Sequence, residues 1–338
     1  MMKKIITLGE MLLRLSTDVG KRLSQADQLD MNYGGAEANV GVSLSSFGYD
    51  VYFVSKVPDN PLGLAAERHL KTNGVRTDFL LKGGGRLGTY YVESGAGIRS
   101  SQVTYDRKHS SFSQMTSEEI QFEDIFKDAA LFHITGITPA LSSGLVELTL
   151  LALQKAKENG VTTSFDFNYR SKLWSQQEAA VTMKRFLPYV DICSCGELDA
   201  IYLLGMERAP DSLDKETRLT YYYENIQQRY PNIQYFSSTF RDVFSASTNT
   251  LQGNLFTGGA LYQSRIYQMD HIVDRVGGGD AFAAGMLYGI LEDMPFEEAV
   301  TFATAASVMK HTVLGDCNTF LPEEIKTFAS QAPGKIVR

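Results

Sequence analysis

Three adjacent glycines lead directly into an aspartate and an alanine-rich segment in the stretch Val276-Gly277-Gly278-Gly279-Asp280-Ala281-Phe282-Ala283-Ala284-Gly285. Glycines adopt positive φ and carry no Cβ, so the N–H groups of Gly277 to Gly279 can converge on an anion at a helix N-terminus, where the helix dipole adds favourable potential. Asp280, at the mouth of this anion hole, is placed to accept a proton from an attacking hydroxyl and is expected to be ionised at neutral pH. Taken alone, the same residues are equally compatible with a flexible turn and an N-cap aspartate.

A second pair of glycines precedes a helical pattern near the N-terminus, in Asn32-Tyr33-Gly34-Gly35-Ala36-Glu37-Ala38-Asn39-Val40-Gly41-Val42. Asn39 lies one turn inside that predicted helix, where its amide could hold a sugar hydroxyl. The presence of this segment favours the functional interpretation of the first one.

Strand and helix patterns alternate along most of the chain, which predicts an α/β fold with a doubly wound, mainly parallel sheet flanked by helices. Strands are expected at residues 4–8, 51–54, 131–134, 162–167 and 191–195, and helices at residues 36–47, 62–73, 143–159, 176–187, 281–291 and 296–311. Residues 233–267 are typical of consecutive antiparallel strands, with turns at Asn249 and at Gly258-Gly259. Ligands of such sheets bind at the carboxyl ends of the parallel strands.

Short, glycine-broken β segments between residues 77 and 107, together with residues 12–31, predict a small β-sheet lid interleaved with the main domain. The expected division assigns residues 1–11, 34–76 and 108–338 to the α/β domain that binds nucleotide and substrate. Residues 12–33 and 77–107 form the lid in this division. An exposed small sheet is an aggregation liability that pairing with a second lid would cover, so a homo-oligomer formed through the lid is expected.

Composition excludes several classes of function. The net charge is −7 and the basic residues are scattered, which argues against a nucleic acid or a membrane surface as partner. The apolar stretch after Lys3 and Lys4 is interrupted too early for a signal peptide, and no segment reaches transmembrane length. Three cysteines without zinc-ligand spacing fit a reducing compartment. A cytoplasmic protein that handles small molecules is therefore predicted.

The two glycine-containing segments resemble the two signatures of the ribokinase-like (PfkB) family of carbohydrate kinases. Further matching segments follow in family order: Gly9-Glu10, Tyr105-Asp106-Arg107, Gly136-Ile137-Thr138-Pro139-Ala140-Leu141, Asp166-Phe167-Asn168-Tyr169-Arg170 and Leu173-Trp174. Within the family, this set is most similar to kinases of 2-keto-3-deoxygluconate. The resemblance implies an ATP-dependent, Mg²⁺-requiring enzyme that phosphorylates the terminal hydroxyl of that sugar acid, with Asp280 as the base and the backbone of Gly277, Gly278 and Gly279 as the anion hole.

The resemblance also implies a substrate site. Arg107 and Arg170 are the cations that would bind the carboxylate of the sugar acid, because the arginine fork suits a carboxylate. Strand alternation alone places Asp166, Asn168 and Arg170 on one side, where they would form a shared polar cluster. The full set of expected substrate-binding residues is Gly35, Asn39, Tyr90, Tyr105, Arg107, Asn168, Arg170 and Asp316.

For the nucleotide and the metal, the resemblance implies a set in which this chain departs from its relatives. Glu197 matches a glutamate that organises water bound to Mg²⁺, although a first-turn acid opposing the helix dipole is nearly as good an interpretation. Ser194 stands where relatives have asparagine, and Arg275 where they have a small residue or proline. The nucleotide-side loop at residues 237–242 contains no glycine, so hydroxyl groups or the Arg241 guanidinium are expected to contact phosphate there. The expected nucleotide-binding residues are Ser194, Ser238, Arg241, Gly277, Gly279 and Thr304.

Two other functions remain open at this point. A fructokinase or ribokinase would act on a neutral sugar and would not need two arginines facing the acceptor. A non-catalytic sugar-binding regulatory protein is compatible with the altered nucleotide-side loop.

Overall fold

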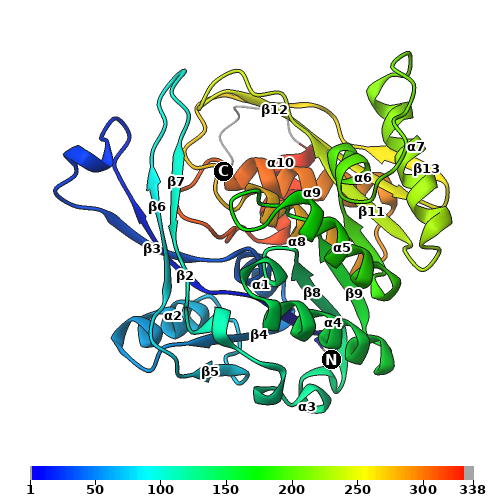
Figure 1. Ribbon diagram of the computed structural model, residues 1–338. Helices are drawn as coiled ribbons and strands as arrows, with labels where there is room; N and C mark the ends of the chain where they lie inside the picture. The colour runs from blue at the N-terminus through cyan, green and yellow to red at the C-terminus, as the bar shows by residue number, and fades with distance from the viewer. Residues whose placement is uncertain (1, 331–338) are drawn as a thin grey trace.

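The computed structural model describes residues 2–330, and a large twisted sheet forms the centre of the molecule (Figure 1). Its strand order is β13-β12-β11-β10-β9-β8-β1-β4-β5, with β14 paired to β12. The strands from β5 to β11 are parallel, and they span β5 Leu80–Lys82, β4 Asp50–Val57, β1 Lys4–Leu8, β8 Ala129–Thr135, β9 Thr162–Asp166, β10 Ile192–Ser194 and β11 Tyr235–Phe240. The antiparallel strands are β12 Asn249–Thr257, β13 Ala260–Gln263 and β14 Tyr267–Met269.

Helices cover both faces of this sheet because successive strand residues point to opposite sides. Ile6 and Phe132 pack into one core and Ile5 and Leu131 into the other. The first core lies under α3 Phe122–Phe126, α4 Ser143–Glu158, α5 Gln176–Phe186, α6 Glu197–Tyr202 and α7 Lys215–Arg229. The second lies under α1 Ala36–Ser46, α2 Pro61–Thr72, α8 Gly278–Leu291, α9 Phe296–Lys310 and α10 Pro322–Ser330. The predicted doubly wound α/β fold is confirmed.

A separate four-stranded sheet projects from the main domain at the left of Figure 1. Its order is β3-β2-β6-β7, with β3 Asp30–Gly34, β2 Leu12–Ser16, β6 Gly88–Glu93 and β7 Gln102–Asp106. We call this sheet the lid. It differs from the expected boundaries at two places: Gly34 ends a lid strand, and β5, which falls within residues 77–107, pairs with β4 in the large sheet.

Several local expectations were wrong or incomplete. Asn249 is the first residue of β12 rather than a turn residue. Helix α7 was not expected, because its inward stripe consists of Leu219, Tyr222, Tyr223 and Ile226 among many polar residues. These four side chains follow helical spacing, and the tyrosine rings supply most of the apolar surface.

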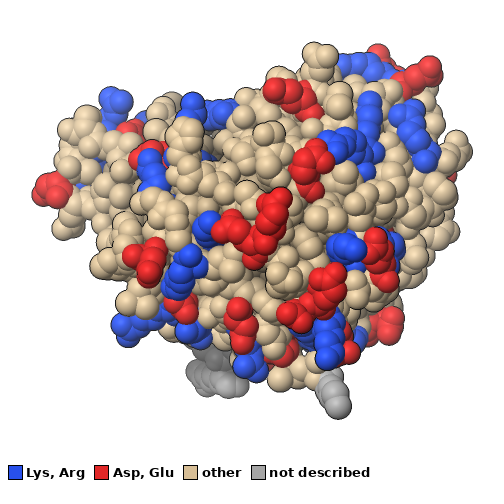
Figure 2. Space-filling view, turned by 60° about the horizontal axis from the view of Figure 1, so that its bottom comes forward, with Lys and Arg blue, Asp and Glu red and all other residues tan. Residues whose placement is uncertain are grey.

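Acidic and basic side chains are interspersed on the face of the molecule in Figure 2. No helix within residues 2–330 is long and apolar enough to cross a membrane.

Candidate active site

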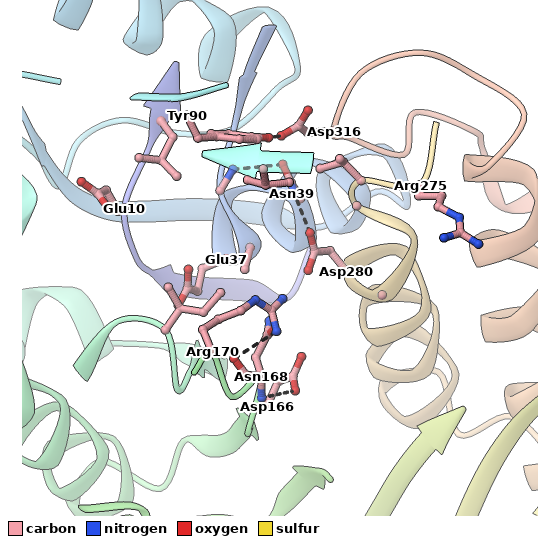
Figure 3. A pocket seen from close by; sticks show the side chains of 18 of the residues that line it. Glu10, Glu37, Asn39, Tyr90, Asp166, Asn168, Arg170, Arg275, Asp280 and Asp316 are labelled. Carbon is pink, nitrogen blue, oxygen red and sulfur yellow. Dashed lines mark hydrogen bonds between the residues drawn. The ribbon is translucent and has the colours of Figure 1, made fainter. Parts of the chain in front are cut away.

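A cleft of about 630 Å³ lies between the lid and the carboxyl ends of the parallel strands. Residues that follow the parallel strands line the cleft: Glu10 after β1, Asn168 after β9 and Arg241 after β11. The lid contributes Tyr90 and Tyr105. This edge of a parallel sheet is where the sequence predicted a ligand site. Figure 3 shows the side chains that converge there.

The three glycines that precede Asp280 have three different roles. Gly277 adopts φ 79° in the left-handed region, and a Cβ there would lie 1.7 Å from the Asp316 backbone oxygen. At Gly278 a Cβ would lie 2.2 Å from the His311 ring. A Cβ at Gly279 would meet no atom within 4 Å, and this residue faces the cleft with Gly277. Helix α8 begins at Gly278, so Asp280 lies inside its first turn and not ahead of the helix as expected.

Asp280 is held by Asn39 across the two glycine-containing segments. The Asn39 Nδ2 donates to Asp280 Oδ2 at 2.7 Å, and Asn39 Oδ1 accepts from the Gly35 N–H at 3.3 Å. Burial raises the pKa of Asp280 to about 6, although the Asn39 hydrogen bond and the charge of Arg170 act in the opposite direction. The expectation of an ordinary carboxylate is therefore corrected, and Asn39 orients the acid in addition to lining the cleft.

The predicted polar cluster after β9 is present, because Asp166, Asn168 and Arg170 all line the cleft. Asp166 Oδ1 accepts from the Asn168 N–H at 3.1 Å, which stabilises Asn168 at φ 39°. Burial, and then the charge of Asp280, raise the pKa of Asp166 to about 7. Arg170 is exposed and donates to the carbonyls of Asn168 and Tyr169, at 3.3 and 3.2 Å. Within residues 2–330 it forms no ion pair with a carboxylate.

Arg107 is placed differently from Arg170. Its Nε donates to Glu10 Oε2 at 2.7 Å, and both side chains are buried. Glu10 therefore already neutralises the charge of Arg107, which was expected to be free for a substrate carboxylate. The other Glu10 oxygen, Oε1, is buried without a hydrogen-bond partner.

A buried network of charged side chains, which sequence analysis did not predict, connects the lid to the main domain beside the cleft. Arg14 on β2 donates through Nη1 to Asp274 at 2.7 Å and to Asp316 at 2.8 Å. Asp274 accepts in turn from the N–H groups of Val276 and Gly315, at 3.0 and 3.1 Å. The hydroxyl of Tyr90 donates to Asp316. The network thus joins two lid strands to the loops on both sides of the anion hole.

The sequence signal for this network was available in Arg14 itself. Arg14 lies in an apolar strand, between Leu13 and Leu15, and it is 4 % exposed. A buried arginine requires a carboxylate partner. The partners lie 260 and 302 residues further along the chain, so no local pattern identifies them.

Of the six expected nucleotide-binding residues, Arg241, Gly277 and Gly279 line the cleft, and Ser194, Ser238 and Thr304 do not. The Ser194 and Ser237 hydroxyl groups bond to each other at 2.9 Å. The Ser238 Oγ accepts from the Tyr223 hydroxyl at 2.8 Å. Thr304 is fully buried, with its hydroxyl donating to the Val300 carbonyl at 2.7 Å. This burial contradicts a direct nucleotide contact by Thr304. Thr239, one of the hydroxyl residues expected in the loop at residues 237–242, lines the cleft, and so does Arg275, which was not assigned a contact with nucleotide.

Glu197 does not line the cleft either. Its carboxylate lies 3.5 Å from the guanidinium of Arg218. Asp199, half a turn further along α6, is the acid on this helix whose charge raises the pKa of Asp166. Burial raises the pKa of Asp199 itself. Asp199 does not line the cleft either, and its carboxylate accepts a hydrogen bond from the Gly196 N–H at 2.8 Å.

Comparisons with known proteins agree with this geometry. The model of the pfkB family of carbohydrate kinases matches residues 2–324. The chain belongs to this family, and the resemblance identified from the sequence is confirmed.

Among characterised relatives, a 2-dehydro-3-deoxygalactonokinase of Haloferax volcanii is 34 % identical over 96 % of each chain. A 2-dehydro-3-deoxygluconokinase of Bacillus subtilis is 28 % identical over 96 % of this chain and 95 % of its own. The solved structure of a 2-dehydro-3-deoxygluconokinase from Thermotoga maritima has a TM-score of 0.94 and 42 % identity, and covers 97 % of this chain and 100 % of its own. The protein is accordingly a sugar kinase by family.

Proposed function

We propose that this protein transfers the γ-phosphoryl group of ATP to the terminal hydroxyl of 2-keto-3-deoxygluconate or its galactonate-derived epimer. The observation that carries this proposal is the exposed, carboxylate-free guanidinium of Arg170, whose charge acts on Asp280 within the same cleft. Arg170 would hold the substrate carboxylate so that the other end of the sugar acid reaches Asp280 (Figure 3). The names of the relatives from Haloferax volcanii and Bacillus subtilis support the same substrate class.

In this proposal Asp280 accepts the proton of the sugar hydroxyl as the hydroxyl attacks phosphorus. Its pKa of about 6 leaves it ionised at neutral pH and close to the range where a general base works well. Asn39 fixes the orientation of the carboxylate. The N–H groups at Gly277 and Gly279 and the N-terminus of α8 would stabilise the negative charge that develops on the transferred group.

The cleft also has a chemistry that fits ATP and Mg²⁺. No group of three or more His, Cys, Asp or Glu side chains within residues 2–330 is arranged as a metal site. Mg²⁺ bound with a nucleotide needs only one or two protein carboxylates, since phosphate oxygens and water complete its shell. Asp166, which lines the cleft, is the acid that would hold it, and an acid of the neighbouring α6, Glu197 through water or Asp199, would complete the site. When bound, the metal would neutralise phosphate charge during transfer.

Assembly through the lid and a cytoplasmic location belong to the same proposal. The lid ends in two edge strands, β3 and β7, and Met31 on β3 is 57 % exposed. Light scattering of the purified protein would test the assembly: a dimer or higher oligomer is expected, and a strict monomer at micromolar concentration would contradict it.

An ADP-release assay tests the proposed reaction. ADP production is expected only when ATP, Mg²⁺ and 2-keto-3-deoxygluconate are all present. Asp280→Asn in the same preparation controls for contaminating kinases. If the parent protein and this variant release ADP equally, or if neither does, the proposed reaction is wrong.

A further inference from the structure

Two arginines meet at one end of the cleft. Arg241 directly follows β11, and Arg275 lies two residues before Gly277. Both line the cleft together with Gly277 and Gly279. The pKa of Arg241 is lowered first by desolvation and then by the charge of Arg275. The second cause indicates that the two guanidinium groups are close enough to repel each other. In Figure 3, Arg275 and Arg170 lie on opposite sides of Asp280.

No carboxylate compensates this pair within residues 2–330. Arg275 donates through Nη2 only to neutral acceptors, the Ser245 carbonyl at 3.1 Å and Asn249 Oδ1 at 2.6 Å. Its Nε is buried without an acceptor. The adjacent acid on each segment is occupied elsewhere, since Asp242 pairs with Lys215 at 3.3 Å and Asp274 with Arg14 at 2.7 Å.

A third group is exposed to the same positive potential. Burial lowers the pKa of His311 to about 4, and the charges of Arg241 and Arg275 contribute in the same direction. His311 Nε2 is buried and has no hydrogen-bond partner. Arg241 is solvent-exposed and Arg275 is half-buried, so water screens part of their repulsion. What remains of that repulsion, together with the unsatisfied buried Nε of Arg275, is unfavourable in the absence of an anion. The arrangement therefore favours the arrival of an anion.

We propose that Arg241 and Arg275 together form a clamp for the phosphate groups of the nucleotide donor, in place of the glycine-lined loop that residues 237–242 lack. The planar guanidinium fork suits phosphate oxygens, and the hydrogen bond from Nη2 to Asn249 orients the Arg275 guanidinium. This inference rests on the proposed function, because it takes ATP as the donor. It assigns to Arg275 a role in binding, although its position in the signature carries a small residue or proline in relatives.

Titration calorimetry with ATP and with AMP, in the absence of any sugar, tests the clamp. We expect Arg275→Met and Arg241→Met each to weaken ATP binding roughly 10-fold or more, as for the loss of a charge-assisted hydrogen bond. AMP binding should change much less, because AMP lacks the terminal phosphates. Arg275→Lys, which keeps the charge but not the fork, should lose part of the ATP affinity. Arg185→Met is the matched control, because Arg185 pairs with Glu147 on the surface at 2.9 Å and its removal changes the net charge equally.

Thermal unfolding separates a binding role from a structural one. The ligand-free Arg275→Met protein should melt somewhat lower than the parent, because buried Asn249 and the Ser245 carbonyl lose their donor. The diagnostic quantity is the further rise in melting temperature on adding ATP, which should be smaller in the variant. ATP affinity equal to that of the parent in both methionine variants would overturn the clamp, as would equal losses for ATP and AMP. Absence of ATP binding by the parent protein would instead contradict the proposed function, so the two failures are distinguishable.

Discussion

The two ends of the cleft differ in whether their arginines are paired with carboxylates. At the lid end, each buried arginine already has its carboxylate: Arg14 contacts Asp274 and Asp316, and Arg107 contacts Glu10. At the other end, Arg241 and Arg275 both line the cleft, and neither forms an ion pair with a carboxylate of residues 2–330. Breaking a buried ion pair leaves an unpaired buried charge and is strongly unfavourable. The paired network therefore holds the lid and the glycine loop in fixed positions. An uncompensated pair favours binding of an anionic ligand.

Asp280 lies between these two regions, and its replacement should produce the largest effect on turnover. We expect Asp280→Asn to lower kcat by at least roughly 10²-fold, the lower end of general-base contributions. Binding of ATP and of the sugar acid, measured by calorimetry, should change little because both ends remain intact. Turnover close to that of the parent would remove Asp280 from the mechanism.

The next prediction compares the two ends directly by their stability. Arg14→Met leaves the buried Asp274 and Asp316 without their cation, which should cost about 3 to 5 kcal/mol in the free energy of unfolding. Arg275→Met should cost less, about 1 to 2 kcal/mol, because only the neutral acceptors of Asn249 and Ser245 lose a donor. Urea unfolding of both variants checks this difference. Equal losses in the two variants would mean that the two ends do not differ as described.

Substrate choice sharpens the comparison between an arginine that has no carboxylate partner within residues 2–330, Arg170, and a paired one, Arg107. Arg170→Ala should weaken use of the keto-acid, measured as kcat/KM, by about 1.5 to 3 kcal/mol, the range for losing a hydrogen bond to a charged group. A neutral sugar such as fructose should be affected much less. Arg107→Ala should instead lower stability, because it leaves Glu10 buried and unpaired. If Arg107→Ala impairs keto-acid use without a loss of stability, Arg107 and not Arg170 reads the carboxylate.

The pH dependence is the smallest of these effects near neutrality. Because Asp280 must be ionised to act as base and its pKa is about 6, kcat/KM should fall about tenfold per pH unit below pH 6. Burial raises this pKa from 3.8, so the folded state holds more protons than the unfolded state between about pH 4 and 6. The free energy of unfolding should therefore decrease as pH rises through that window. An activity profile that is flat from pH 5 to 8 would contradict the role of Asp280.

Sequence analysis predicted the parallel sheet, and it predicted that the two glycine-containing segments precede helices at the ligand site. Both predictions depend on local patterns. The strands alternate with helices of ordinary length, and Gly277 with Asp280 forms a compact motif. It missed the pairing of Arg14 with Asp274 and Asp316, since the partners are distant along the chain. It did not identify Asp199, whose charge contributes to the raised pKa of Asp166, because the direction in which a side chain leaves a helix is not visible in the sequence.

One measurement tests the central claim most directly: a competition in which the protein, ATP and Mg²⁺ meet equal concentrations of 2-keto-3-deoxygluconate, fructose and ribose, with the phosphorylated products identified by mass spectrometry. If Arg170 selects an acid substrate for Asp280, the phosphate of the keto-acid should dominate in the parent protein, and this preference should shrink in Arg170→Ala. A product mixture dominated by fructose or ribose phosphate would contradict the account.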